Sequence, residues 1–161
     1  PVLMPLTGDG FPPSAVDAFK GMRSAEGERM CLEENFFVEQ ILPMAVMRDL
    51  GGAEMAAYRR PFSEPGEGRR PTLTWPREIP IDGEPAYVGR VLEANVAWLE
   101  ETHVPKLFIA GDPGLIATGP VAERCRGFPN TREVAVPGLH YLQEDSPEAI
   151  GAALADWIGS L

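Results

Sequence analysis

One stretch decides the fold: Val134-Ala135-Val136-Pro137-Gly138-Leu139-His140-Tyr141-Leu142-Gln143-Glu144-Asp145-Ser146-Pro147. Its short β-branched start predicts a strand that stops at Pro137-Gly138. Ser146 is a favourable N-cap with Pro147 at the first helical position, so a helix is expected to begin there. The stretch therefore predicts a strand, a loop and a helix in succession.

His140 lies in the loop between this strand and this helix and is one of two histidines in the chain. In open α/β sheets, chemistry collects in loops at the carboxyl ends of strands. A neutral imidazole can accept a proton near pH 7, which makes His140 a candidate general base. The alternative is a histidine that only hydrogen-bonds its own loop.

The chain from about residue 85 onward alternates between helical and strand patterns. Apolar residues at helical spacing predict three helices, at about Pro85–Thr102, at Pro120–Arg126 and from Pro147 onward with Ile150, Leu154, Trp157, Ile158 and Leu161 on one face. Two short apolar runs predict strands buried on both faces, at Lys106–Ala110 and Glu133–Val136. This order is that of a parallel sheet with right-handed crossovers, so the expected fold class is α/β.

Two parallel strands are too few for an independently stable sheet, which usually needs three or more. Strands buried on both faces also require more sheet than the sequence contains. We therefore expect the chain to be part of a larger fold, whose missing strands come from a preceding segment or from another chain.

The first 80 residues are expected to be helical and irregular. Apolar spacing predicts helices at Ser14–Arg23 and Ala53–Arg60 and one helix or a helix pair at Glu28–Leu42, with a break or kink at Pro43. Residues 1–13 are expected to be loop, apart from a marginal strand at residues 2–4. Prolines recur from residue 61 to residue 85, and we expect them to exclude a regular helix there.

Charge and composition exclude several classes of function. With 161 residues, 44% hydrophobic and 24% charged, the chain has the composition of a globular domain. A net charge of −10 argues against nucleic-acid binding, and no apolar run approaches the roughly 20 residues that span a bilayer. Cys31 and Cys125 give neither a disulfide framework nor metal-ligand spacing, and the N-terminus does not resemble a signal peptide. We expect a cytoplasmic protein that binds no metal, nucleic acid or membrane.

Four blocks of sequence closely resemble haloalkane dehalogenases, best the subfamily that includes hexachlorocyclohexane-degrading enzymes. They are, in chain order, Glu34–Pro43, Glu54–Phe62, Arg69–Ile81 and Gly138–Asp145. The resemblance runs from about Phe19 to the C-terminus, and several blocks in the right order are more specific than any single motif. It implies an α/β-hydrolase fold in which residues 1–80 form a helical cap and residues 81–161 form the C-terminal part of the main domain.

The resemblance also implies an activity. Such enzymes hydrolyse carbon–halogen bonds without a metal or an organic cofactor, and their partners are a small halogenated hydrocarbon and a halide ion. An aspartate displaces the halide and forms an alkyl-enzyme ester, and a histidine held by a carboxylate then activates water against that ester. His140 matches the histidine of this family.

The chain departs from the family pattern at other catalytic positions. No residue corresponds to the nucleophilic aspartate or to the halide-binding tryptophan and asparagine, so the N-terminal half of the same fold is an expected partner. In some subfamilies the acid that orients the histidine lies in the loop that corresponds to Gly111-Asp112-Pro113-Gly114. Asp112 is near that position, but we favour its interpretation as an aspartate that stabilises the turn.

Substrate-binding residues follow from the resemblance as well. A dry, apolar pocket favours attack by a carboxylate. The pocket walls fall on Phe37, Ile41 and Ala45 in the cap, Trp75, Pro76 and Ile79 at its end, and Leu115 and Ile116 after the first strand. For Phe37 and Ile41 the alternative is simple helix core.

The remaining charged groups receive structural interpretations. Glu144, Asp145 and Glu148 are expected to complement a helix dipole, His103 to lie at the surface, and Arg69-Arg70 to lie in a solvated loop.

Two rival hypotheses for the function stay open. One is a luciferase or another capped hydrolase on the same scaffold, because a fold alone does not determine chemistry. The other is a non-catalytic fragment that complements a second chain.

Overall fold

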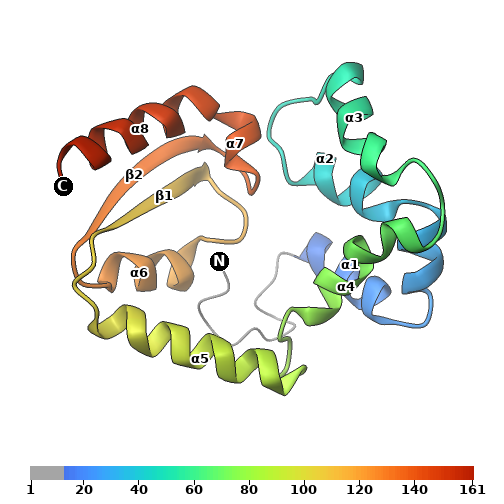
Figure 1. The fold of residues 1–161 in the computed structure, drawn as a ribbon, viewed down its shortest axis with the longest axis horizontal. Coiled ribbons are helices and arrows are strands. Elements are labelled where there is room, and N and C mark those ends of the chain that lie inside the picture. Colours follow the sequence, from blue (N-terminus) through green and yellow to red (C-terminus); the bar gives the residue numbers. More distant parts are fainter. Residues whose placement is uncertain (1–12) are drawn as a thin grey trace. The chain divides into compact units, whose positions relative to one another are not determined.

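The computed structural model describes residues 13–161, which form two compact units whose elements are shown in Figure 1. The helical unit contains the described residues up to Met44 together with Asp49–Gly89. The sheet unit contains Ala45–Arg48 and Arg90–Leu161. The strand expected at residues 2–4 and residues 1–12 of the loop expected at residues 1–13 lie outside the described residues, and Pro13, expected in that loop, begins a helix.

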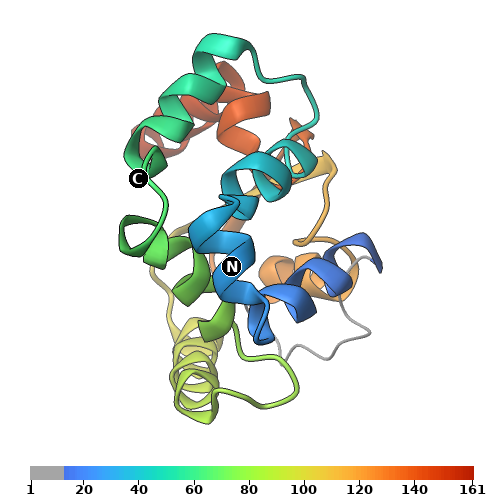
Figure 2. The ribbon, with the colours of Figure 1, turned by 90° about the vertical axis from the view of Figure 1, so that its right-hand side faces the viewer.

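The helical unit consists of short helices (Figure 2). They are α1 (Pro13–Arg23), the π-helices η2 (Arg29–Glu33) and η3 (Phe37–Ile41), α2 (Leu42–Met44), α3 (Gly52–Arg59), the 3-10 helices η4 (Arg60–Phe62) and η5 (Glu67–Arg69), and α4 (Arg70–Glu78). The helices predicted near residues 14–23 and 53–60 are confirmed, although Ser14 lies inside α1 rather than before it. Of the helix or helix pair expected at residues 28–42, the structure has the pair, as the two π-helices η2 and η3. At the end of η3 the N–H of Leu42 donates to the carbonyl of Phe37. The helix predicted to break at Pro43 ends at Met44.

Helix α4 contradicts the expectation that the prolines of residues 61–85 exclude a regular helix. Pro71 lies in the first turn, where an N–H would have no partner within the helix. Pro76 removes one internal hydrogen bond, but Pro76 and Leu73 are fully buried in the core of the unit. Burial of the apolar face therefore outweighs the local cost of the proline.

Arg69 is buried, which corrects the expectation that the Arg69-Arg70 pair lies in a solvated loop. Only 6% of Arg69 is exposed, and its guanidinium donates to four backbone carbonyls, those of Leu32, Glu33, Phe62 and Ser63. Arg70 instead forms ion pairs at the surface with Glu28 and Glu67. The acceptors of Arg69 come from segments far apart in sequence, so no local pattern could reveal them.

Two further arginines connect the C-terminal ends of α1 and α4. Arg23 of α1 donates to the carbonyls at the end of α4, those of Pro76, Arg77 and Ile79. Arg77 of α4 donates in return to the carbonyls of Met22 and Ser24 at the end of α1. The last carbonyls of a helix lack donors within the helix, so each helix caps the other.

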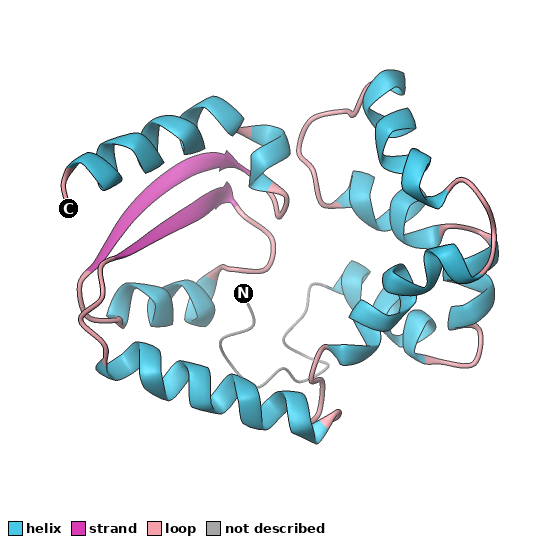
Figure 3. Cartoon of the chain, in the orientation of Figure 1, coloured by secondary structure: helices cyan, strands magenta, loops and turns pink. Residues whose placement is uncertain are grey.

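The sheet unit contains two parallel strands, drawn in magenta in Figure 3. Strand β1 (Lys106–Pro113) pairs with β2 (Thr131–Gly138) along its whole length. Helix α6 (Gly119–Gly127) joins them, and α6 and α8 (Pro147–Gly159) lie on opposite sides of the strands (Figure 1). The parallel strands and the helices predicted around them are confirmed, and both strands extend beyond their predicted ends.

The strands are not buried on both faces, contrary to expectation. In β1 only Ala110 is buried, and in β2 only Val136 and Gly138. Helix α5 (Ala86–Glu101), whose first residues belong to the helical unit, supplies Val96 to a core cluster with Cys125 and Phe128. The predicted apolar face of α8 is exposed at Leu154, Ile158 and Leu161. The two strands that the structure describes are thus covered only in part.

No helix among residues 13–161 is long and apolar enough to cross a membrane.

Candidate active site

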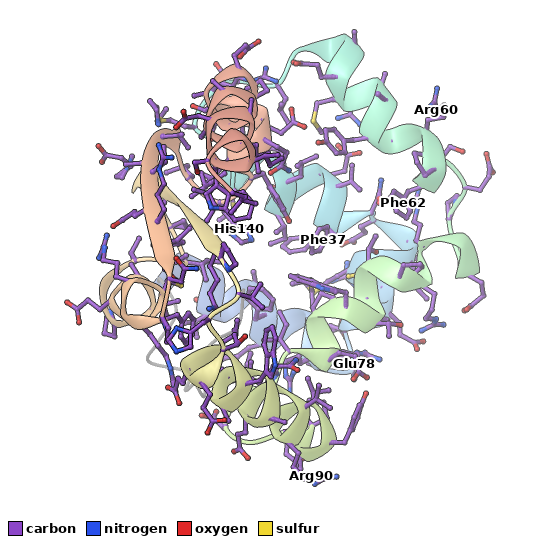
Figure 4. The ribbon with its side chains drawn as sticks, turned by 60° about the vertical axis from the view of Figure 1, so that its left-hand side comes forward. Phe37, Arg60, Phe62, Glu78, Arg90 and His140 are labelled. Atoms are coloured by element: carbon purple, nitrogen blue, oxygen red, sulfur yellow. The ribbon has the colours of Figure 1, made fainter. Side chains whose placement is uncertain are left out.

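His140 lies in the turn between β2 and the short helix α7 (Leu142–Asp145), at the carboxyl end of β2 (Figure 4). The predicted place of this histidine after a strand end is confirmed. Its side chain is half-buried, and this burial lowers the pKa of His140 below the usual 6.5. A histidine that stays neutral at pH 7 can accept a proton from water.

The imidazole of His140 packs against the ring of Tyr141, with the two centroids 4.9 Å apart. In the part of the chain that the structure describes, no side chain forms a hydrogen bond with this imidazole. Asp112 lies near the end of β1, exposed and paired in the sheet with Pro137, and forms no hydrogen bond with His140. Asp112 therefore does not orient this imidazole through a hydrogen bond in the structure.

The backbone of the His140 turn is bonded to Ala45–Arg48, a segment far away in sequence that belongs to the same unit. The carbonyl of Ala45 accepts hydrogen bonds from the N–H groups of His140, at 3.0 Å, and Tyr141, at 3.1 Å. Ala45 is only 4% exposed. The structure thus brings two predicted site residues, Ala45 and His140, into direct contact through their backbones.

Asp145 is a functional candidate that the sequence analysis missed, because it was expected only to complement a helix dipole. Its carboxylate accepts hydrogen bonds from the backbone N–H groups of Met47 at 2.8 Å, Arg48 at 3.1 Å and Leu139 at 3.1 Å. Partial burial alone would raise the pKa of Asp145, but these three N–H groups outweigh it and hold the pKa below the usual 3.8. No sequence pattern indicates these contacts, since Met47 and Arg48 are nearly one hundred residues away.

Gly138 allows the turn to close on Asp145. Its φ of 151° lies in the region that favours glycine, and a Cβ there would lie 2.8 Å from Leu142 Cδ2 and 3.0 Å from Asp145 Oδ2. Ser146 follows, at the predicted N-cap position of α8, but its hydroxyl does not cap the helix. It donates instead to the carbonyl of Pro137 at 2.6 Å, which joins the start of α8 to the end of β2.

Five of the predicted pocket residues belong to the helical unit: Phe37, Ile41, Trp75, Pro76 and Ile79. Ile79 is part of a buried core cluster, and Phe37 and Ile41 are partly buried against it. The rings of Phe37 and Trp75 meet edge to face, with centroids 5.9 Å apart and planes at 84°. Trp75 is 52% exposed and adds an aromatic surface to this pair. Phe37 and Ile41 make core contacts, which were the alternative interpretation of both residues.

Leu115 and Ile116 lie in the loop between β1 and α6, and both are half-buried. They follow the end of a strand, as predicted. Among residues 13–161, no group of three or more His, Cys, Asp or Glu side chains is placed to hold a metal ion.

Comparison with known proteins gives strong similarities along nearly the whole chain. No model of a protein family matches it. The chain is 49% identical over 160 residues to a haloalkane dehalogenase of Sphingobium indicum, which covers 99% of this chain and 54% of that protein. The crystal structure of haloalkane dehalogenase DbeA from Bradyrhizobium elkani matches with a TM-score of 0.92 and 41% identity, covering 98% of this chain and 56% of that one.

A protein with a different named activity is also similar. The chain is 46% identical over 139 residues to the coelenterazine h 2-monooxygenase of Renilla reniformis, which covers 85% of this chain and 44% of that protein. In all these comparisons the chain spans about half the length of the curated relatives it matches.

Proposed function

We propose that this chain, a homologue of haloalkane dehalogenases with part of their α/β-hydrolase fold, forms the base-bearing part of an enzyme that hydrolyses carbon–halogen bonds. The observation that carries this proposal is the His140 turn. It presents a half-buried imidazole of lowered pKa at the carboxyl end of a parallel strand. The chain that carries this turn is 49% identical in sequence to a haloalkane dehalogenase.

The remaining catalytic groups are proposed to lie outside this chain. The chain spans about half the length of its curated relatives, and its two described strands are only partly covered. Both observations support a partner that is the N-terminal half of the same fold and carries the nucleophilic aspartate. Residues 1–80 would then be the cap, and residues 81–161 the end of the main domain.

The reaction would proceed in two steps. A carboxylate oxygen of the nucleophilic aspartate attacks the carbon that carries the halogen, and the carbon–halogen bond breaks with its electron pair leaving on the halide. His140 then removes a proton from water, whose oxygen attacks the carbonyl carbon of the resulting ester. The alkoxide takes up the proton held by His140 and leaves as the alcohol, and the new carboxyl group releases its remaining proton to solvent, which restores the carboxylate. His140 acts only in the second step.

The substrate class follows from the apolar residues in each unit. We assign the binding of a small halogenated hydrocarbon to Phe37, Ile41, Ala45, Trp75, Pro76, Ile79, Leu115 and Ile116. The contact between the partly buried Phe37 and the exposed Trp75 supports this assignment, because apolar ligands bind to aromatic surfaces with few polar groups.

The test uses the intact protein that carries this chain, with 1,2-dibromoethane as substrate. Unaltered protein should release bromide over many turnovers. The His140→Ala variant should release one bromide per active site and then stop, with the alkyl ester visible as added mass. The matched control is His103→Ala, which should turn over normally. Continued turnover by His140→Ala would show that His140 is not the base.

A second candidate activity is oxidation of coelenterazine h, favoured by the similarity to the Renilla reniformis protein. Oxygen consumption with coelenterazine h, without bromide release from 1,2-dibromoethane, would support it over dehalogenation.

Residues 1–161 alone should release no bromide, and release by this chain unaided would contradict the proposed location of the nucleophile.

A further inference from the structure

The turn that carries His140 is held at both of its ends by one distant segment. On one side, the carbonyl of Ala45 accepts the N–H groups of His140 and Tyr141. On the other side, the carboxylate of Asp145 accepts the N–H groups of Met47 and Arg48. The segment Ala45–Arg48 therefore supplies one acceptor, the carbonyl of Ala45, and the His140 side supplies the other, the carboxylate of Asp145. Together the two sets of bonds define where the turn lies.

Asp145 also reaches back to the residue before the histidine. Its Oδ2 accepts the N–H groups of Leu139 at 3.1 Å and Met47 at 3.0 Å, while its Oδ1 accepts those of Met47 and Arg48 at 2.8 and 3.1 Å. The backbone on either side of His140 is thus bonded, at Leu139 by Asp145 and at His140 and Tyr141 by Ala45. A side chain that leaves such a backbone has its Cα fixed before it reaches any substrate.

The role of Asp145 in the dipole of α8 does not account for this arrangement. Charge near the start of a helix requires no particular acceptor geometry. The neighbouring Glu144 illustrates the difference, because its carboxylate forms an ion pair with the guanidinium of Arg48. The short reach of Asp145 is also required, since Oδ2 lies within 3.0 Å of where a Cβ on Gly138 would be.

We propose that Asp145 is a positioning residue for His140: its carboxylate joins Leu139 to the segment Ala45–Arg48 and thereby places the imidazole for attack of water on the ester. It touches neither substrate nor reacting atoms. The catalytic part of this inference rests on the proposed function, and the structural part rests on the hydrogen bonds alone.

The variant Asp145→Asn tests the proposal with minimal change of shape. If the amide oxygen keeps the N–H groups of Met47 and Arg48, the amide NH2 faces the N–H of Leu139, and a donor meets a donor. If the amide turns over, the bond from Arg48 and the shorter of the two bonds from Met47 are lost instead. Either orientation loosens the His140 turn while the core of the unit is left unchanged.

The expected result separates the two chemical steps, because His140 acts only in the second. With 1,2-dibromoethane and the intact protein, Asp145→Asn should release the first bromide at a rate within about threefold of the unaltered protein. Steady-state turnover should fall by about 10- to 100-fold, as misplacement of a catalytic group by about 1 Å predicts, and the ester should accumulate. The control Glu144→Gln should retain the original turnover.

Two outcomes would overturn the proposal. In the first, the first-turnover bromide and the steady-state rate of Asp145→Asn fall by the same factor, which is the result of a smaller folded fraction. In the second, Asp145→Asn turns over as fast as the unaltered protein.

A second measurement keeps the inference separate from the proposed function. If the unaltered protein releases no bromide, dehalogenation is wrong, but the amide exchange of Leu139, Met47 and Arg48 and the imidazole NMR signals of His140 still test the placement. Asp145→Asn should speed exchange at these amides by about tenfold or more and should shift the imidazole signals. Unchanged imidazole signals would contradict the placement of His140 by Asp145.

Discussion

Two regions of this protein satisfy their backbones with side chains of opposite charge: the arginine contacts of the helical unit and the Asp145 contacts around His140 in the sheet unit. In the helical unit, the cationic side chains of Arg23, Arg69 and Arg77 donate to backbone carbonyls. In the sheet unit, the anionic side chain of Asp145 accepts from backbone N–H groups around His140. The difference follows from which backbone groups each of these regions leaves unpaired. Short helices end in carbonyls without donors, whereas the turn after β2 and the segment Ala45–Arg48 present N–H groups without acceptors.

The comparison teaches that each kind of contact suits a different task. Arg69 reaches four carbonyls from a single buried position, so it joins segments that form no sheet or long helix. The side chain of Asp145 is short and bonds only to N–H groups close to it in space, so it fixes the position of one turn. We expect that loss of the Arg69 contacts affects stability most and that loss of the Asp145 contacts affects catalysis most.

The largest effect is expected for Arg69→Met, which keeps the bulk of the side chain and removes its donors. The carbonyls of Leu32, Glu33, Phe62 and Ser63, in buried and partly buried contacts, would lose their partner, and the free energy of unfolding in urea should fall by about 3 kcal/mol. The neighbouring Arg70→Met removes only surface ion pairs and should change stability little. Equal losses in the two variants would contradict the role assigned to Arg69.

Gly138→Ala should have the next largest effect, in the sheet unit. The added Cβ would crowd Leu142 and Asp145 at a φ of 151°, and we expect a loss of about 1–3 kcal/mol together with slower ester hydrolysis. Thermal unfolding and single-turnover kinetics measure the two effects. The control is Gly151→Ala in α8, where nothing lies within 4 Å of the new Cβ, and a gain of about 0.5–1 kcal/mol is expected. Ester hydrolysis at the original rate in Gly138→Ala would show that the turn tolerates displacement.

A smaller effect is expected in the pH dependence of stability through His140. Burial lowers the pKa of His140 in the folded state below its value of about 6.5 in the unfolded chain. The unfolded state therefore binds the proton more readily, and stability should fall as the pH drops through about 6.5. His140→Phe should remove this part of the dependence in urea unfolding followed from pH 8 to pH 5, whereas His103→Phe should retain it. Identical profiles for both variants would contradict the effect of burial.

The smallest effect is expected at acid pH, where the two kinds of contact diverge. The pKa of Asp145 is lowered in the folded state, so its contribution to stability is present above the usual 3.8 and is lost as the pH falls through the lower folded value. Guanidinium groups remain charged in this range, so the bonds of Arg69 to carbonyls persist. At about pH 3, the amides of Met47 and Leu139 should therefore lose protection from exchange before the interior of the helical unit does. Simultaneous loss in both units would remove the contrast between them.

Most of the regular structure could be predicted from local patterns. Helical spacing located α1, α3, α5, α6 and α8, and the short apolar runs located β1 and β2 and their parallel order. The prediction failed at α4, where two prolines counted against a helix that burial of Leu73 and Pro76 stabilises. It also failed for Arg69, because its four acceptors come from other segments.

The candidate site could be predicted only in part. His140 was located correctly in the turn after β2 because a strand end, a glycine and a helix start are all local features. The bond network that holds it could not be predicted, since Ala45 and Asp145 are one hundred residues apart and nothing in either neighbourhood indicates the other.

By itself, the sequence determined the order of the elements, the histidine in the loop after the second strand and the likeness to haloalkane dehalogenases, because periodicity, capping residues and sequence blocks are read along the chain. The tertiary structure alone decided which side chains satisfy which backbone groups. A buried N–H or carbonyl must find a partner wherever the folded chain supplies one. For that reason Asp145, ordinary in the sequence as an acid before a helix, became the group that joins the His140 turn to Ala45–Arg48.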